Sequence, residues 1–170
     1  GEIEHIEGNR FSIGELDGTS SDRCKSLAAA LISAGLKAPI RSRIRHDLWV
    51  KLLGNVVFNP MSALTGATLE EMATHPESGA IARAVMVEVD ELAEALGVRL
   101  PLTIDQRMDG ARKVGAHKTS MLQDLESGRP MELESVVGVV IELGEKLGLP
   151  MPLTRTLYSC TKLLSQVRNN

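Results

Sequence analysis

This sequence has few aromatic residues and no large surplus of one charge. Only 2% of the 170 residues are aromatic, and 19 Lys and Arg residues stand against 22 Asp and Glu residues, for a net charge of −3. Proteins that hold nucleic acid generally need a basic surface, and those that hold single strands also stack the bases on aromatic rings. We therefore expect no nucleic-acid partner and a core of aliphatic side chains.

Cysteines and long apolar runs are scarce as well. The two cysteines, Cys24 and Cys160, lie far apart in a sequence without Cys-x-x-Cys, so neither a zinc framework nor a disulfide framework is indicated. We expect both thiols to be free and buried, in a protein of the reducing cytoplasm. No segment reaches the roughly 18 consecutive apolar residues of a membrane helix, so no membrane partner is expected.

Sequence motifs for metals and for phosphate groups are absent too. The four histidines show no His-x-x-x-His spacing, and we expect no metal site. Neither G-x-G-x-x-G nor G-x-x-x-x-G-K-[ST] occurs. The sequence therefore has no loop of its own for the phosphates of a nucleotide.

What remains is enough for one globular domain, or for one domain with part of another. Hydrophobic residues make up 43% and charged residues 24% of the sequence, the proportions of an ordinary folded protein. Because the sequence starts at Gly1 rather than at Met, we expect a fragment of a longer protein or a chain released from a tag.

The first 44 residues predict a small β-β-α-β unit. Segments 2–6 and 11–16 have the composition of a β-hairpin, with turn residues between them. A capped helix should follow and end at Gly35, before an extended segment at 38–42. Three strands leave unpaired edges, so we expect further strands to pair with this unit or to cover it.

From about Ile44 onward every periodic segment is helical. Apolar residues recur at the three- and four-residue spacing of helices that bury one face. The predicted helices cover 45–59, a short segment opened by the capping box of Thr68 and Glu71, 77–96, 103–114, 118–127, 132–147 and 154–167. The predicted fold is mainly α, a helical bundle over 45–170 that follows the β-β-α-β unit over 1–44.

A polar stripe crosses the most apolar of these helices. Lys51, Asn55 and Asn59 are spaced by four residues and so lie along one side of it. Burying such groups without partners costs about 1–7 kcal/mol each. The stripe is therefore expected to face water, a partner or a ligand cleft.

Pro60 should kink or end this helix directly after the stripe. It lacks an N–H, and its ring clashes with the carbonyl of Val56. A purely structural interpretation also fits, in which Lys51 extends its ammonium to solvent and the two amides cap the break.

A second group of polar residues lies between two later helices. Residues 120–124 read SMLQD, and Glu132 follows at the start of the next predicted helix. Helical spacing places Glu132 in line with Val136, Val139, Val140 and Leu143. A carboxylate there is favoured by the helix dipole and could pair with a cation, or it could be a terminal helix charge without a further role.

Together these residues resemble the C-terminal domain of the ketopantoate reductase (2-dehydropantoate 2-reductase) family. The matching residues are KLLGNVVFNPMSALT from Lys51 to Thr65, SMLQD at 120–124 and a Glu twelve residues after Ser120. The segment from Ile13 to Gly18 is similar to the last strand and turn of the nucleotide-binding domain of that family.

The resemblance implies two domains. Residues 1–44 would be the C-terminal remnant of an NADP-binding Rossmann domain. Residues 45–170 would be an all-α substrate-binding and catalytic domain, similar to the C-terminal bundle of 6-phosphogluconate dehydrogenase. NADPH would be bound mainly by the N-terminal domain, whose glycine-rich loop is absent, so the chain alone is expected to be inactive.

The resemblance also implies a reaction, the NADPH-dependent reduction of 2-dehydropantoate to pantoate on the route to pantothenate and coenzyme A. Lys51 would be the general acid. Asn55 and Asn59 would hydrogen-bond polar groups of the substrate, and Ser120 would contact its carboxylate. Glu132 would orient the substrate or the lysine and would also contact the cofactor.

Two alternatives remain. Some members of the family carry an Asn where this chain has Leu69, so the substrate could be another 2-oxo acid. The chain could instead be a non-catalytic dimerisation module built on the 77–96 helix, with a dispensable polar stripe. The expected partners are a small 2-oxo acid and, as an option, a second copy in a homodimer.

Overall fold

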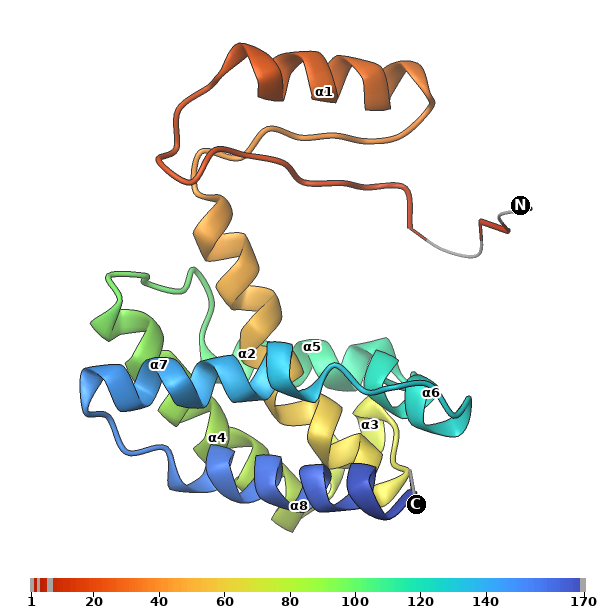
Figure 1. The fold of residues 1–170 in the computed structure, drawn as a ribbon, viewed down its shortest axis with the longest axis vertical. Helices are drawn as coiled ribbons and strands as arrows, with labels where there is room; N and C mark the ends of the chain where they lie inside the picture. The colour runs from red at the N-terminus through yellow and green to blue at the C-terminus, as the bar shows by residue number, and fades with distance from the viewer. Residues whose placement is uncertain (1, 3, 6–7, 169–170) are drawn as a thin grey trace. The chain divides into compact units, whose positions relative to one another are not determined.

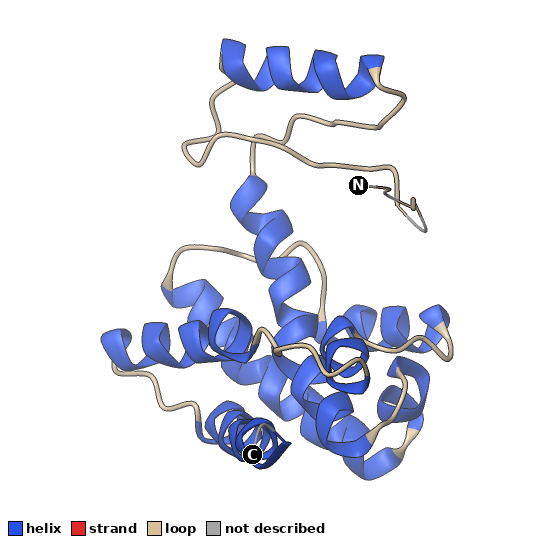
Figure 2. Cartoon of the chain, turned by 45° about the vertical axis from the view of Figure 1, so that its right-hand side comes forward, coloured by secondary structure: helices blue, strands red, loops and turns tan. Residues whose placement is uncertain are grey.

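The computed structural model describes residues 2, 4–5 and 8–168. Over these residues the chain consists of helices and connecting loops (Figure 2). It forms two compact units, Gly1–Leu48 and Trp49–Asn170, called the first and the second unit below.

The first unit contains one helix, α1 (Asp22–Ser33), between two extended segments. Ser21 caps α1 by accepting a hydrogen bond from the Cys24 N–H. The extended segments pair in parallel: the Lys37 N–H donates to the Asn9 carbonyl, and the Phe11 N–H donates to the Lys37 carbonyl, both at 2.7 Å. The unit is therefore a parallel pair of segments joined by a crossover helix.

The strands predicted for the first unit are seen among the described residues only as two isolated bridges, at residues 10 and 37 and at residues 13 and 40. The segment 11–16 finds its partner near residues 37–41 rather than in an antiparallel hairpin. Residues 3, 6 and 7, part of the predicted hairpin, lie outside the described residues. Two paired segments without neighbours are too few for a regular sheet.

The second unit is a bundle of helices, as predicted (Figure 1). Its elements are α2 (Ile44–Thr65), within which the unit begins, α3 (Leu69–Thr74), α4 (Pro76–Ala95), α5 (Ile104–Val114), α6 (Ser120–Glu126), the π-helical turn η1 (Glu134–Gly138), α7 (Val139–Leu147) and α8 (Pro152–Arg168). The central helix is α4, which contacts α3, α5, α7 and α8.

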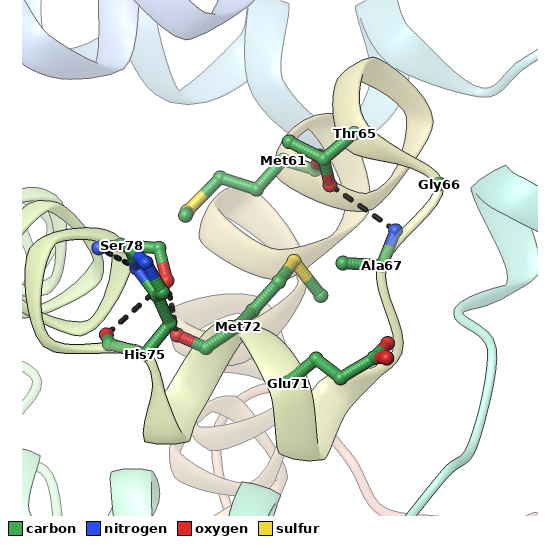
Figure 3. A pocket seen from close by; sticks show the side chains of 8 residues that line it. All are labelled: Met61, Thr65, Gly66, Ala67, Glu71, Met72, His75 and Ser78. Carbon is green, nitrogen blue, oxygen red and sulfur yellow. Dashed lines mark hydrogen bonds between the residues drawn. The ribbon is translucent and has the colours of Figure 1, made fainter.

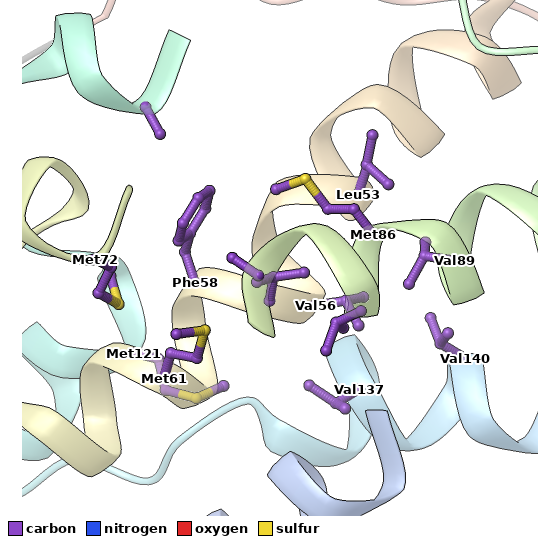
Figure 4. Packing of buried hydrophobic residues seen from close by; sticks show 14 of the residues in the cluster. Leu53, Val56, Phe58, Met61, Met72, Met86, Val89, Met121, Val137 and Val140 are labelled. Atoms are coloured by element: carbon purple, nitrogen blue, oxygen red, sulfur yellow. The ribbon is translucent and has the colours of Figure 1, made fainter. Parts of the chain in front are cut away.

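The core of the second unit is aliphatic and rich in methionine, in line with the low aromatic content. Figure 4 shows side chains of α2, such as Val56 and Phe58, packed with Met86 and Val89 of α4 and with Val137 of η1. Each of these side chains is at most 1% exposed. At about 1.5–3 kcal/mol for each buried side chain, this cluster is the main source of stability in the bundle.

Helix α2 continues through Pro60 to Thr65, so the prediction that it ends at Asn59 is wrong. Proline inside a helix costs about 3 kcal/mol. Phe58 and Met61, on either side of Pro60, are both buried in the core cluster. Their burial outweighs the cost of the proline, because ending the helix would expose the turn that carries Met61.

The helix predicted for 132–147 also differs. Its first turn, η1, is π-helical, and the Val139 N–H donates to the Glu134 carbonyl five residues before it. The buried residues are Leu133, Val137, Val140, Ile141 and Gly144. Of the face predicted to contain Glu132, Val136 and Leu143 pack half-buried against the core, whereas Val139 is exposed. The wider π-helical turn shifts the buried face away from regular α-helical spacing.

The cysteines follow the prediction in part. Both are free, and Cys24 is buried in the first unit. Cys160 is exposed on α8, contrary to the expectation.

The start of α8 is held by a carboxylate of α4. Glu88 accepts hydrogen bonds from the N–H groups of Leu153 and Thr154 at 2.9 Å, and from the hydroxyl of the buried Thr154 at 2.7 Å. The first N–H groups of a helix have no partners within it. Glu88 therefore fastens α8 to α4 while satisfying three donors.

Replacing Glu88 by Ala should lower the free energy of unfolding by about 1–3 kcal/mol, because three donors lose their acceptor at once. Urea unfolding followed by circular dichroism measures this loss. Glu91→Ala is the matched control, since Glu91 is exposed on the same helix. Equal effects of the two substitutions would contradict the capping role of Glu88.

Candidate functional site

The polar stripe on α2 runs from the surface into the bundle. Lys51 is exposed, Asn55 is half-buried, and Asn59 is only 5% exposed. The structure records no side-chain hydrogen bond from these three residues to any described residue. The amides therefore do not cap a break at Pro60, as the structural interpretation required, and their polar groups remain free to bind a ligand.

Two buried hydroxyls connect this stripe to the start of α6. The Ser62 hydroxyl donates to the Asn59 carbonyl at 2.9 Å, and Ser62 Oγ lies 2.5 Å from Thr119 Oγ1. Because the single hydroxyl proton of Ser62 is used, Thr119 is the donor between them. Thr119 also caps α6 by accepting from the Leu122 N–H. This contact holds the start of α6, whose first residue is the exposed Ser120, against the turn of α2 that follows Asn59.

Glu132 has an anchored backbone and a free carboxylate. Its carbonyl accepts hydrogen bonds from the Val136 N–H at 3.1 Å and from the Ser135 hydroxyl at 3.2 Å. Its neighbours Met131 and Leu133 both pack in the core cluster. The carboxylate itself is exposed, with no hydrogen bond or ion pair recorded to a described residue.

Two side chains of α8 contact η1, the turn after Glu132. The Tyr158 hydroxyl donates to the Glu134 carboxylate at 2.8 Å, and Lys162 Nζ lies 3.0 Å from Glu134 Oε1. These bonds, that of Lys162 first, hold the pKa of the Glu134 carboxyl below its ordinary value. A Cβ at Gly138 would lie 2.7 Å from this carboxylate, which would have to shift to make room for it. The cluster links η1, the turn that follows Glu132, to α8.

A guanidinium lies against α2 next to the stripe. Arg107 of α5 packs on the backbone of Gly54, so closely that a Cβ at position 54 would come within 1.8 Å of Arg107 Nη2. The guanidinium of Arg107 has no hydrogen bond or ion pair with any described residue, and its Nε is buried without a partner. Burial lowers the pKa of Arg107 from its ordinary value.

The sequence analysis missed Arg107, although one signal for it exists. Glycine within a helix costs about 1 kcal/mol relative to alanine, so Gly54 in a buried helix calls for a packing reason. The reason is the close approach of the guanidinium. The sequence does not say which side chain makes that approach.

A cavity of about 500 Å³ at the far end of α2 is a poor candidate for the site (Figure 3). None of the predicted site residues lines it. Its polar groups are already paired: Thr65 donates to the Met61 carbonyl, Ser78 donates to the Met72 carbonyl, and Glu71 is held in the Thr68 capping box. The cavity offers a ligand mainly apolar surface.

The contacts of Ser62 join the turn of α2 that follows Asn59 to Thr119, the residue before Ser120. No hydrogen bond between described residues links the side chains of Ser120 and Asn59. Between described residues, no hydrogen bond or ion pair joins Lys51 to Glu132. The roles of the five predicted residues remain predictions.

Metal and membrane sites were also predicted to be absent. Within the described ranges, no group of three or more His, Cys, Asp or Glu side chains is placed to hold a metal ion. None of the helices described is long and apolar enough to cross a membrane.

The chain is similar in sequence and structure to ketopantoate reductases. Residues 43–165 match the family model described as ketopantoate reductase PanE/ApbA C terminal. A 2-dehydropantoate 2-reductase from Mesorhizobium japonicum is 48% identical over 168 residues, which are 99% of this chain and 52% of that protein. One from Archaeoglobus fulgidus is 29% identical over 88% of this chain and 51% of that protein.

A solved structure shows the same fold. The crystal structure of 2-dehydropantoate 2-reductase from Methylococcus capsulatus superimposes with a TM-score of 0.89 and 32% identity, over 98% of this chain and 54% of that one. The chain thus spans about half the length of the curated relatives it matches.

Ser62→Ala and Thr119→Val should each lower the free energy of unfolding by about 1–3 kcal/mol, because a buried partner is left unsatisfied. Since the two hydroxyls bond each other, the double variant should lose less than the sum of the single losses, by about 0.5–3 kcal/mol. Urea unfolding of the four proteins measures this coupling. Strictly additive losses would contradict the link between α2 and α6.

Proposed function

The chain belongs to the family of ketopantoate reductase C-terminal domains, and on this basis we propose that it is the substrate-binding and catalytic part of an enzyme that reduces 2-dehydropantoate to pantoate. The observation that carries the proposal is the stripe of Lys51, Asn55 and Asn59, whose side chains are unpartnered among the described residues and enter the bundle. The matched span also includes Ser120 and Glu132.

In the proposed reaction the ketone carbon gains a hydride and the ketone oxygen gains a proton. NADPH, when bound, supplies the hydride and becomes NADP⁺. Lys51 donates the proton, and its ammonium stabilises the alkoxide charge that develops only as the hydride arrives. Asn55 and Asn59 hydrogen-bond the substrate, and Ser120 contacts its carboxylate. After proton transfer the neutral amine of Lys51 regains a proton from solvent.

Glu132 is the residue of this chain that we assign to the cofactor as well as to catalysis. Its exposed carboxylate, with no recorded partner among the described residues, fits a hydroxyl or amide donor of a nicotinamide cofactor. The chain contains no glycine-rich phosphate loop. We therefore assign the main binding of NADPH to other residues of a longer protein, and expect the chain alone to be inactive.

We assign residues 1–44 to the end of a Rossmann domain and residues 45–170 to the catalytic domain. In support, the parallel segments joined by α1 have the β-α-β connection of such domains. Large apolar side chains of this unit, such as Phe11 and Leu27, are about half exposed. In a longer protein these side chains would be covered by the rest of the sheet and its helices.

A second candidate substrate is another 2-oxo acid. Leu69, where some relatives carry a substrate-binding Asn, is half-buried against the core cluster and offers no hydrogen bond to a ligand. Without that Asn, this chain would lack one of the polar groups by which those relatives select 2-dehydropantoate over similar acids. A homodimer and a cytoplasmic location remain predictions.

In the full-length protein, Lys51→Ala should lower kcat for 2-dehydropantoate by about 10²–10⁴-fold, the usual contribution of a general acid, with a smaller change in KM. Lys51→Arg should lose nearly as much, because arginine keeps the charge but is a very weak acid. Steady-state assays measure both.

The matched control is Lys113→Ala, which removes an exposed lysine of α5. It should leave kcat unchanged. Near-normal turnover by Lys51→Ala would contradict the assignment and favour the non-catalytic module. Activity toward a panel of 2-oxo acids decides between the two substrates.

A further inference from the structure

The residues proposed to bind substrate leave the charge of a 2-oxo acid uncompensated. Lys51 is positive and Glu132 is negative, so they balance each other. Asn55, Asn59 and Ser120 are neutral. Moving a carboxylate out of water into a protein site is costly unless a cation or several donors receive it. A further cation close to Lys51 would remove this imbalance.

Arg107 has the properties of such a cation. Arg107 is half-buried, and its Nε is buried. Its guanidinium has no hydrogen bond or ion pair with any residue the structure describes. A guanidinium in this state has already lost part of its hydration without gaining an anion. Arginine keeps its charge even when burial lowers its pKa.

Its position relative to Lys51 follows from helix geometry. Gly54 is three residues after Lys51, and Asn55 is four residues after it. Residues at these two spacings lie on either side of the first residue along the helix surface. The guanidinium therefore packs on the helix position that neighbours Lys51 on the side opposite to Asn55.

We propose that Arg107 binds the carboxylate of the substrate, beside the ketone oxygen that Lys51 protonates. A 2-oxo acid carries these two groups on adjacent carbons, which matches two cations on adjoining positions of one surface. The planar guanidinium can donate two parallel hydrogen bonds to a carboxylate. The hydroxyl of Ser120 then adds a neutral hydrogen bond.

Gly54 makes the proposed position of the Arg107 guanidinium possible. Any side chain at this position would occupy the place of the guanidinium, because even a Cβ would lie 1.8 Å from Nη2 and 2.4 Å from Cζ. Gly54 therefore gives Arg107 access to the surface of α2 beside Lys51. This inference rests on the proposed function, since it assumes that Lys51 faces the substrate.

The test compares Arg107→Met with the wild type in the full-length protein. We expect KM for the 2-oxo acid to rise about 10- to 100-fold, the usual effect of losing a charged hydrogen bond, and kcat to change by less than about threefold. Isothermal calorimetry should show the same loss of affinity for the acid without turnover. Lys113→Met, which removes an exposed cation of the same helix, should change neither value.

A neutral substrate analogue separates charge recognition from a structural role. For the methyl ester of the same acid, Arg107→Met should differ from the wild type by less than about threefold, because no carboxylate is present to lose its partner. An equal loss on acid and ester would overturn the proposal, and so would an unchanged KM for the acid.

Gly54→Ala supplies an independent variant if Arg107→Met fails to fold. Alanine favours the helix, and the long Arg107 side chain can swing away from the new Cβ. KM for the acid should rise as in Arg107→Met, and combining both substitutions should add little. Full additivity of the two effects would overturn the proposal.

The outcomes also separate this inference from the proposed function. If the wild-type protein reduces 2-oxo acids and Arg107→Met does so with normal KM, only the role of Arg107 is wrong. If the wild-type protein reduces none, both the function and the role of Arg107 are wrong.

Discussion

The rest of the structure depends on the burial of α2, an apolar helix that also carries polar side chains. Val56, Phe58 and their neighbours hold α2 in the core, so the helix cannot turn its polar side to bulk water along its whole length. Lys51, Asn55 and Asn59 consequently pass from the surface into the bundle. The core thus fixes where these polar groups point, and it leaves them without recorded partners in the described chain.

The surroundings of the stripe are arranged by a few polar connections between helices. The hydroxyls of Ser62 and Thr119 join α2 to the start of α6. Glu134 is held by Tyr158 and Lys162, and this contact fixes the turn that follows Glu132. Ser120, the first residue of α6, and Glu132, just before η1, thus lie beside segments that are tied to other helices, as a binding site requires.

The sequence predicts the helical bundle, its caps and the polar stripe, because these features depend on spacing within single segments. The sequence predicts less well those features that depend on contacts between segments distant in the chain. Helix α2 continues through Pro60 because Phe58 and Met61 are buried on either side of it. The π-helical turn at 134–138 changes which side chains are buried, and Arg107 contacts Gly54 from another helix. Pairing of 11–16 with residues near 37–41 is likewise a contact that local patterns do not determine.

The central claim is that this chain carries the proton donor and substrate site of a 2-oxo acid reductase. The most direct test measures pantoate formed and NADPH consumed when the full-length protein is given 2-dehydropantoate. We expect one pantoate for each NADPH oxidised, and no reaction with the 170-residue chain alone. If the full-length protein forms no 2-hydroxy acid from any 2-oxo acid, the proposed role of this chain is wrong.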